Sequence, residues 1–263
     1  MITDDDRCSS TDLGAVGAWL WVVHILLPAL AAWSLAWAVA PARPPRGLAA
    51  LVLFGAVLSA YLGDRLRDRR LAWPRRWRRI GWLLAGGCAL LSAGAMLVGR
   101  GWSGVEWLLP PVAVVAVYPW LGRVPLVKNL AVAGCWWWAG TMLVSADWSR
   151  AASPAALTLG LLVFVGAGLC DVKDVASDRR RGIRSAVALW GVGGGMAFFI
   201  AVLLLTGGWL IGADLPVGWW LPWTGLLLLA GRPAWLARPL VGAISVDAVL
   251  ALSGPAVVTG LFW

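Results

Sequence analysis

Long apolar segments separated by short charged segments recur along the whole chain. Apolar segments of about 20 residues are long enough to cross a bilayer as α-helices. No stretch between them is long enough to build a separate soluble domain. The pattern predicts an all-α, polytopic membrane helical bundle that forms one domain over residues 1–263. We expect nine helices, at 14–40, 46–63, 80–99, 104–121, 129–147, 154–170, 185–213, 217–230 and 240–263.

The boundary between the seventh and eighth predicted helices is the least defined. The segment "GGWLIGADLPVGWWLPW", residues 207–223, contains two prolines and several glycines, and it can be divided in more than one way. A bundle of eight helices therefore stays open as an alternative.

The composition agrees with a membrane protein. Of the 263 residues, 60% are hydrophobic and only 13% are charged, and the mean hydropathy is +0.79. A soluble domain of this size averages nearer a quarter charged residues. The polar head "MITDDDRCSSTD" lacks the basic flank and small-residue cleavage site of a signal peptide, so we expect it to be retained.

The basic residues are divided unevenly between the two sides of the predicted bundle. Of the 22 Lys and Arg residues, 18 fall in the N-terminal head or in the loops after the second, fourth, sixth and eighth helices. Lys and Arg are retained on the cytoplasmic side of a membrane. We therefore expect the N terminus and these loops in the cytoplasm of a multi-pass cell-membrane protein. The net charge of +9 is explained by helix ends, and no nucleic-acid partner is expected. The four remaining residues are Arg43, Arg46, Arg100 and Arg150.

Topology does not explain a cluster of aspartates in "CDVKDVASDRRRGIRS", residues 170–185. In an α-helix, Asp171, Asp174 and Asp178 would lie within about 60° of one another, on one face. Three carboxylates so close repel one another unless a cation sits among them. One interpretation is a solvated helix whose acids pair with Lys173 and the arginines. The other is a divalent-ion site, in which hard oxygen ligands hold Mg²⁺ shared with a phosphate.

A second acidic cluster stands at the cytoplasmic end of the second predicted helix. In "LSAYLGDRLRDRR", Asp64 and Asp68 are four residues apart and project from one face. Two such helix ends can face one another across a bundle. Mg²⁺ ions with Arg and Lys can then neutralise a diphosphate while its ester bond breaks, and the apolar bundle would take a hydrocarbon tail.

These residues resemble the motifs of the UbiA-type membrane prenyltransferases. The spacing DxxDxxxD at Asp171, Asp174 and Asp178, closed by "GIRS" at residues 182–185, resembles the family's second signature. The segment "VYPWLGRVPLVKNLAVAGCWW" is similar to the family's connection between the fourth and fifth helices. The matching residues there are Tyr118, Arg123, Lys128 and Asn129.

The resemblance implies a Mg²⁺-dependent enzyme, a prenyltransferase that moves an isoprenyl group from an isoprenyl diphosphate to a hydrophobic acceptor, aromatic or lipid. Its catalytic aspartates would hold one Mg²⁺ with Asp171, Asp174 and Asp178 and a second with Asp64 and Asp68. The residues expected to contact the diphosphate or to organise its site are Tyr118, Lys128, Asn129, Lys173 and Arg184.

The first motif departs from the family pattern. The family has Asn and Asp where this chain has Ala60 and Tyr61, and an alanine has no oxygen to offer a metal. Two alternatives therefore stay open beside the transferase. One is a membrane terpene cyclase or lyase of the same superfamily, and the other is a non-catalytic protein that binds a prenyl diphosphate or lipid.

Three further features carry weaker hypotheses. Of the three tryptophans in "CWWWAG", at most one or two can face a cavity, because they spread around the helix. His24 is more typical of a hydrogen-bonded core residue than of a base. Asp247 lies within the last predicted helix, where an ionisable group is costly; a functional role and a helix-pairing role stay equally open.

Overall fold

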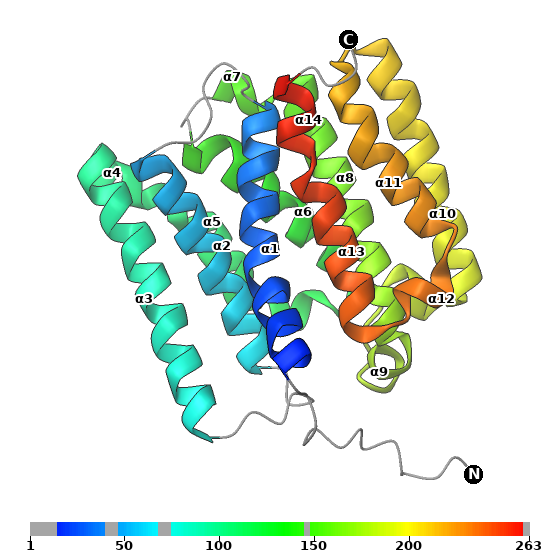
Figure 1. Ribbon diagram of the computed structural model, residues 1–263, viewed down its shortest axis with the longest axis horizontal. Helices are drawn as coiled ribbons and strands as arrows, with labels where there is room; N and C mark the ends of the chain where they lie inside the picture. Colours follow the sequence, from blue (N-terminus) through cyan, green and yellow to red (C-terminus); the bar gives the residue numbers. More distant parts are fainter. Residues whose placement is uncertain (1–14, 40–46, 68–74, 145–147, 260–263) are drawn as a thin grey trace.

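The computed structural model describes residues 15–39, 47–67, 75–144 and 148–259. Within these ranges the chain forms helices joined by short loops, and it forms no strand. Figure 1 shows the long helices running side by side. The elements are α1 (Ala15–Val39), α2 (Leu48–Arg67), α3 (Arg75–Arg100), α4 (Trp102–Val105), η1 (Glu106–Leu108), α5 (Leu109–Leu121), α6 (Val127–Trp138), the π-helical η2 (Ala139–Leu143), α7 (Trp148–Ala151), α8 (Pro154–Cys170), η3 (Asp171–Asp174), α9 (Val175–Arg180), α10 (Ala186–Gly212), η4 (Val217–Trp219), α11 (Trp220–Ala230), α12 (Pro233–Leu236), α13 (Pro239–Ala251) and α14 (Ser253–Thr259).

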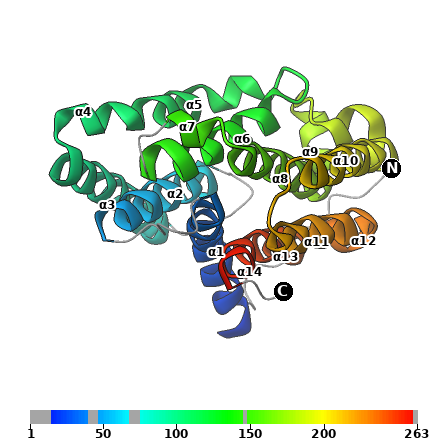
Figure 2. The same cartoon turned by 90° about the horizontal axis from the view of Figure 1, so that it is seen from above.

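The long helices pack as a closed ring. Neighbours around the ring are α1, α2, α3, α5, α6, α8, α10, α11 and α13, with α4 and η1 joining α3 to α5 and with α13 returning to α1. Figure 2 shows this arrangement from above. The ring brings α2, α5, α6, α8 and α13 around a common interior, although these helices are far apart in the sequence.

Each of the nine apolar segments predicted from the sequence is helical in the described ranges. Four helical stretches are long and apolar enough to cross a membrane: Val22–Val39, Arg78–Arg100, Pro154–Arg180 and Ala186–Gly212. Four shorter apolar stretches are Leu48–Asp64, Glu106–Tyr118, Val217–Ala230 and Val241–Ala256. Nine membrane crossings therefore stay a prediction.

The last predicted helix is interrupted between α13 and α14. Pro255 has no N–H, so the carbonyl of Ala251 loses its helical partner. Ser34 on α1 compensates for the break, because its hydroxyl donates to the Ala251 carbonyl and accepts from the backbone N–H of Gly254. The interruption thus joins α1 to the α13–α14 junction.

The core is built around α8. A Cβ at Gly168 of α8 would overlap the ring of Phe199, which is fully buried on α10, so the glycine allows the two helices to approach closely. On the opposite side, a Cβ at Gly166 would lie 3.1 Å from Cγ1 of Val246 on α13. Close packing on both sides fixes α13 and α10 relative to α8, whose carboxyl end carries the second acidic segment.

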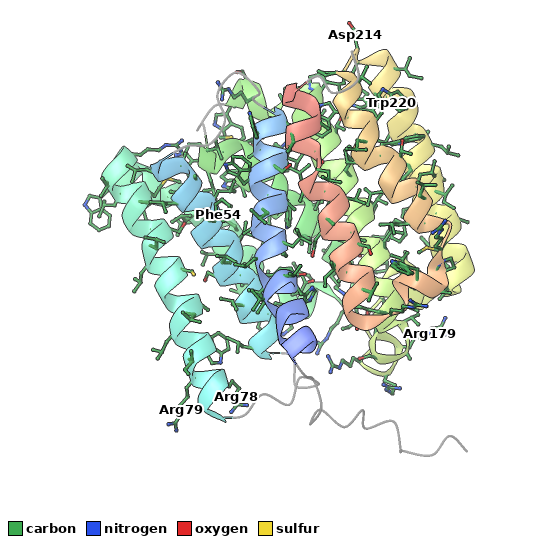
Figure 3. All side chains as sticks on the ribbon, viewed as in Figure 1. Phe54, Arg78, Arg79, Arg179, Asp214 and Trp220 are labelled. Carbon is green, nitrogen blue, oxygen red and sulfur yellow. The ribbon has the colours of Figure 1, made fainter. Side chains whose placement is uncertain are left out.

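Charged side chains gather at one end of the bundle. Figure 3 places Arg78, Arg79 and Arg179 at the same end, and Asp214 at the opposite end. This distribution along the bundle axis agrees with the division of basic residues between the loops. The carboxyl end of α2, which carries Asp64, and α9, which carries Asp178, lie at the arginine-rich end of the bundle (Figure 1).

Candidate functional site

A cavity of about 480 Å³ opens at the arginine-rich end of the bundle. Its wall is formed by α2, the end of α5 and the loop after it, α6, α8, η3, α9 and α13. The charged residues that line it are Asp64, Arg123, Lys128, Asp171, Lys173, Asp174, Asp178, Arg181 and Asp247. The carboxylates of the first motif (Asp64) and of the second motif (Asp171, Asp174 and Asp178) therefore line the same cavity as the basic side chains.

Lys128 and Asp171 form the central ion pair of this wall. The Nζ of Lys128 lies 2.6 Å from Oδ1 of Asp171. The Nδ2 of Asn129 donates to the other carboxylate oxygen, Oδ2, at 3.0 Å. Asn129 is buried, and its Oδ1, also buried, has no hydrogen-bond partner in the structure. Lys128 and Asn129, at the start of α6, thus contact both carboxylate oxygens of Asp171.

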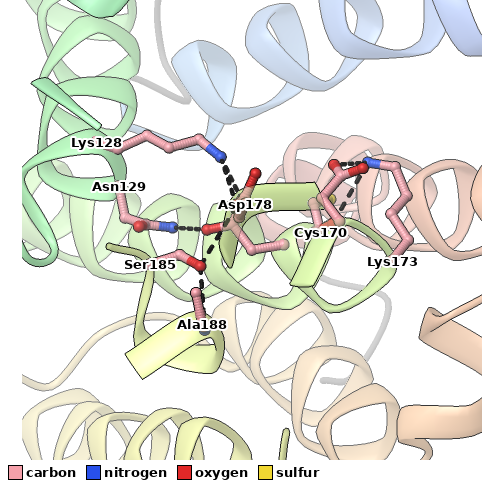
Figure 4. Close-up of polar contacts among 9 residues, drawn as sticks. Lys128, Asn129, Cys170, Lys173, Asp178, Ser185 and Ala188 are labelled. Carbon is pink, nitrogen blue, oxygen red and sulfur yellow. Dashed lines mark hydrogen bonds and ion pairs between the residues drawn. The ribbon is translucent and has the colours of Figure 1, made fainter. Parts of the chain in front are cut away.

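Asp178 joins the same cluster from α9. Its Oδ2 lies 3.7 Å from Nζ of Lys128 and 3.5 Å from the hydroxyl of Ser185. Ser185 also caps α10, because its hydroxyl accepts from the backbone N–H of Ala188 at 3.3 Å. Figure 4 shows these contacts. One lysine therefore bridges two buried carboxylates that come from different turns of the second signature.

Asp174 belongs to a separate, more exposed pair. The Nζ of Lys173 lies 3.2 Å from Oδ2 of Asp174 and donates to the carbonyl of Cys170 (Figure 4). Both side chains line the cavity. Lys173 therefore adds a second lysine–carboxylate pair to the cavity wall.

The three aspartates do not share one continuous α-helix. Asp171–Asp174 form the 3₁₀ turn η3, and the α-helix resumes only at Val175. Side chains three residues apart in a 3₁₀ turn eclipse, and Asp171, Asp174 and Asp178 all line the same cavity, as expected for one face. Their partners differ, because Asp171 and Asp178 lie near Lys128, whereas Asp174 pairs with Lys173.

The "GIRS" segment docks onto the loop between α5 and α6 through its backbone. Gly182 has φ +69°, a conformation that favours glycine. The turn lets the N–H of Ile183 bond the carbonyl of Asp178 at 2.9 Å, and the N–H of Arg184 bond the carbonyl of Gly122 at 2.7 Å. The N–H of Leu126 donates back to the carbonyl of Arg184. These bonds hold Lys128 and Asp178 in register with each other.

The other predicted site residues divide into three groups. Asp64 and Tyr118 line the cavity, as expected. Arg184 is not among the lining residues; its side chain is exposed, and its backbone serves the docking of "GIRS". Asp68 lies outside the described residues, and its predicted metal role stays a prediction.

The charged and aromatic lining residues that were not among the predicted site residues are Tyr61, Arg123, Trp136, Arg181 and Asp247. Trp136 is the one tryptophan of "CWWWAG" that reaches this cavity, whereas Trp137 donates to the carbonyl of Ala151. Arg181 belongs to the arginine run that topology alone already explained. The clue to Asp247 was its position as an acid within an apolar helix.

A smaller, apolar lobe of about 200 Å³ adjoins the cavity between α2, α5 and α6. It shares Tyr61, Asp64, Tyr118, Val132 and Trp136 with the cavity. Its remaining lining is apolar or weakly polar: Ala56, Val57, Ala60, Pro111, Val114, Val115, Ala131, Cys135, Ala139 and Leu143. The charged cavity therefore continues into this apolar lobe.

The aspartates of the cavity are not arranged as a preformed metal-binding site. In the part of the chain that the structure describes, no group of three or more His, Cys, Asp or Glu side chains could hold a metal ion. Asp171 and Asp178 have Lys128 between them instead. Burial of the Lys128 ammonium lowers its pKa, but Asp171, Tyr118 and Asp178 together outweigh burial, so its pKa lies above the ordinary value and the lysine stays charged.

Comparison with known proteins gives a likeness of fold. The chain matches no protein-family model and no curated protein. Among solved structures, it is similar to the apo structure of a UbiA homolog from Aeropyrum pernix K1, with a TM-score of 0.65 and 17% sequence identity. The match covers 90% of this chain and 97% of that chain. The all-helical fold predicted from the apolar segments and the UbiA-like fold implied by the motifs are thereby confirmed: the chain has a UbiA-type fold.

Proposed function

We propose that this protein is a membrane prenyltransferase that transfers an isoprenyl group from its diphosphate to a hydrophobic acceptor. One observation carries the proposal: a cavity with lysines, arginines and carboxylates at its mouth continues into an apolar lobe. An isoprenyl diphosphate has the matching division, with a multiply charged head and a hydrocarbon tail. The likeness of fold to a UbiA homolog supports the same assignment.

The diphosphate would bind at the mouth. Arg123 and Arg181 line the cavity, and both side chains are exposed. Lys173 lines the same cavity, as does the pair of Lys128 and Asp171. Guanidinium groups contact phosphate oxygens through two parallel hydrogen bonds, so these residues are suited to hold the anion while it leaves.

The donor set fits Mg²⁺ by chemistry. Asp64, Asp171, Asp174 and Asp178 all line the cavity, and carboxylate oxygens are the ligands that Mg²⁺ binds together with substrate phosphates. When bound, the metal would neutralise charge on the departing diphosphate. Lys128 lies between Asp171 and Asp178, and Lys173 pairs with Asp174, so the metal would compete with these two lysines for the carboxylates.

The junction between the mouth and the lobe suits a developing carbocation. Tyr61, Tyr118 and Trp136 line both spaces, and aromatic ring faces attract cations. Ionisation of the allylic C–O bond there would place positive charge next to three rings. An electron-rich acceptor would then form a bond to the allylic carbon.

A second function has one observation in its favour. Ala60 and Tyr61 line the apolar lobe at the positions where the resembled family has Asn and Asp. An apolar, aromatic wall suits a cation that is captured by its own chain, as in a terpene cyclase or lyase. It also suits a non-catalytic protein that binds prenyl diphosphate or lipid.

One experiment separates these functions. Purified protein is incubated with Mg²⁺ and labelled geranyl, farnesyl or geranylgeranyl diphosphate, with and without a phenol, a naphthol or a long-chain alcohol, and diphosphate release is followed. Release that requires an acceptor supports the transferase, and release without one, giving a hydrocarbon or alcohol, supports the cyclase. Asp174→Asn should reduce release, whereas Asp214→Asn at the opposite end of the bundle should not.

If no diphosphate reacts and Asp174→Asn leaves prenyl diphosphate binding unchanged, both enzymatic functions are excluded. Binding without any reaction would leave the non-catalytic protein as the correct description. The three outcomes are therefore distinct.

We also propose that the cavity faces the cytoplasm of a cell in whose membrane the protein is embedded. The supporting observation is the concentration of arginines at the end of the bundle where the cavity opens (Figure 3).

A further inference from the structure

Lys128 is shared between two carboxylates in the wall of the cavity. Its Nζ lies 2.6 Å from Oδ1 of Asp171 and 3.7 Å from Oδ2 of Asp178. The first distance is that of a charge-assisted hydrogen bond, and the second is too long for a hydrogen bond. The side chains of the two aspartates are 6% and 3% exposed, whereas that of Lys128 is 19% exposed. The lysine is therefore the most accessible member of a buried cluster.

Each of the two carboxylates is also contacted by a buried neutral donor. Nδ2 of Asn129 on α6 donates to Oδ2 of Asp171 at 3.0 Å, and the hydroxyl of Ser185 lies 3.5 Å from Oδ2 of Asp178 (Figure 4). Asn129 and Ser185 are both only 1% exposed. Lys128 is therefore not alone in positioning the two carboxylates, and they can keep their places when another cation replaces its ammonium.

The charges of the cluster make this replacement conditional. Asp171 and Asp178 carry two negative charges, and removing the cation from a buried carboxylate is costly. Carboxylate oxygens suit Mg²⁺, but an ammonium displaced by a divalent ion would be repelled by it at close range. A diphosphate in the same cavity removes this repulsion, because its oxygens accept hydrogen bonds from the displaced ammonium. Metal and diphosphate should therefore favour each other's binding, with Lys128 as the link.

The side chain of Lys128 is suited to such a change of partner. A lysine carries a compact charge on a flexible four-carbon stem, so its ammonium can turn without a shift of the backbone. Lys128 lines the cavity together with Arg123 and Arg181, whose exposed guanidinium groups would attract the same anion. The cavity thus offers the ammonium both its present carboxylate partners and space for an anionic one.

We propose that Lys128 serves the site in two positions. It is the internal cation of Asp171 and Asp178 until a divalent metal binds there, and it then donates to the diphosphate. This inference rests on the proposed binding of an isoprenyl diphosphate. Lys128 is thereby a positioning residue for the metal and a ligand of the diphosphate. Its change of partner couples the two binding events, and such coupling is reciprocal.

The first test measures the binding of Mn²⁺ alone, because the electron paramagnetic resonance signal of free Mn²⁺ reports how much is bound. Lys128→Gln loses the charge and keeps an amide donor. We expect it to bind Mn²⁺ about tenfold more tightly than the wild-type protein, within the usual range of coupling between two ligands. Arg123→Gln removes the same charge from the same cavity and should have a smaller effect. The double variant Lys128→Gln, Asp171→Asn should lose the gain in affinity.

The second test measures binding of labelled farnesyl thiolodiphosphate with and without Mn²⁺. In the wild-type protein Mn²⁺ should strengthen this binding, partly because it releases Lys128 to the probe. The factor by which Mn²⁺ strengthens binding should be about fivefold or more smaller in Lys128→Gln. Complexes of Mn²⁺ with the probe in solution affect both proteins equally. A purely structural role of Lys128 would weaken probe binding by the same factor with and without the metal.

Two further measurements keep the test decisive if Lys128→Gln is unstable. Mn²⁺ should raise its unfolding temperature more than that of the wild-type protein, because a ligand that binds the folded state stabilises it in proportion to its affinity. Lys128→Arg keeps a cation beside Asp171 and should gain no affinity for Mn²⁺. Equal stabilisation of Lys128→Gln and the wild-type protein by Mn²⁺ would contradict the inference.

The outcomes separate this inference from the proposed function. If Lys128→Gln binds Mn²⁺ no more tightly than the wild-type protein, the two positions of Lys128 are wrong, whether or not the protein transfers an isoprenyl group. If neither protein binds Mn²⁺, the inference and the metal dependence of the proposed function both fail. If Lys128→Gln gains affinity and loses coupling but no isoprenyl diphosphate reacts, the inference holds and the transferase function fails.

Discussion

The ammonium of Lys128 lies 2.6 Å from Oδ1 of Asp171, and the exposed fractions of the two side chains are only 19% and 6%. Substitution of Lys128 by Met would leave the Asp171 carboxylate buried without its cation. Breaking a buried pair in this way costs on the order of 3 kcal/mol. We expect Lys128→Met to lower the unfolding temperature in detergent markedly, and thermal unfolding followed by circular dichroism measures it.

Lys173→Met is the matched control. Its pair with Asp174 is longer, at 3.2 Å, and the Asp174 side chain is more exposed, at 20%. Lys128 also lies 3.7 Å from Asp178, whereas the ion pair of Lys173 is with Asp174, so Lys173→Met should lower the unfolding temperature less than Lys128→Met does. The double variant Lys128→Met, Asp171→Asn should be more stable than Lys128→Met alone. An equal effect of the two single Lys→Met substitutions would contradict the central role of the Lys128–Asp171 pair.

Ser185 has two roles that a pair of serine substitutions can separate. Both Ser185 and Ser153 cap a helix, since each hydroxyl accepts a backbone N–H three residues later, from Ala188 and Ala156 respectively. Either Ser→Ala change should cost about 1 kcal/mol of stability. Only Ser185 also contacts Asp178, at 3.5 Å. We therefore expect Ser185→Ala alone to reduce diphosphate release, and equal activity of the two variants would argue against the contact.

Neighbouring arginines test where the diphosphate binds. Arg181 lines the cavity, whereas Arg180, also exposed, does not. A charge-assisted hydrogen bond contributes about 1.5–3 kcal/mol, and exposure reduces this. Arg181→Gln should weaken binding of a labelled isoprenyl diphosphate about tenfold, and Arg180→Gln should leave it unchanged. Equal affinities of the two variants would place the anion elsewhere.

The helices could be predicted because the lipid interior offers no hydrogen-bond partners to backbone N–H and C=O groups. A membrane segment must satisfy its own hydrogen bonds, so apolar length alone indicates helix. The cavity residues Asp64 and Asp171 were also predicted, because charge at a helix end needs a reason beyond topology, and Lys128 was predicted from the family resemblance. Pro255 is a local signal of the interruption in the last helix, but the compensating contact with Ser34 of α1, 220 positions away in the sequence, is not.

The partners within the site could not be predicted from spacing. The three aspartates line one cavity, but Lys128 lies between Asp171 and Asp178, and Asp174 pairs with its neighbour Lys173 on the 3₁₀ turn. In the same way, the positive φ of Gly182 commits the backbone of Arg184 to the loop at Gly122, so Arg181 lines the cavity in place of Arg184. Local backbone geometry, which a motif does not encode, decided both cases.

The orientation in the membrane can be tested with two introduced cysteines. Arg180 and Asp214 are both exposed. Arg180 lies on α9 and Asp214 in the turn after α10, at opposite ends of the bundle. In a background without the four native cysteines, Asp214→Cys should react with a membrane-impermeant maleimide added to intact cells. Arg180→Cys should react only after the membrane is opened, because the arginine-rich end is expected in the cytoplasm. Mass shift on a gel measures the labelling. The reverse labelling pattern would place the cavity on the outer face of the membrane and would contradict the proposed orientation.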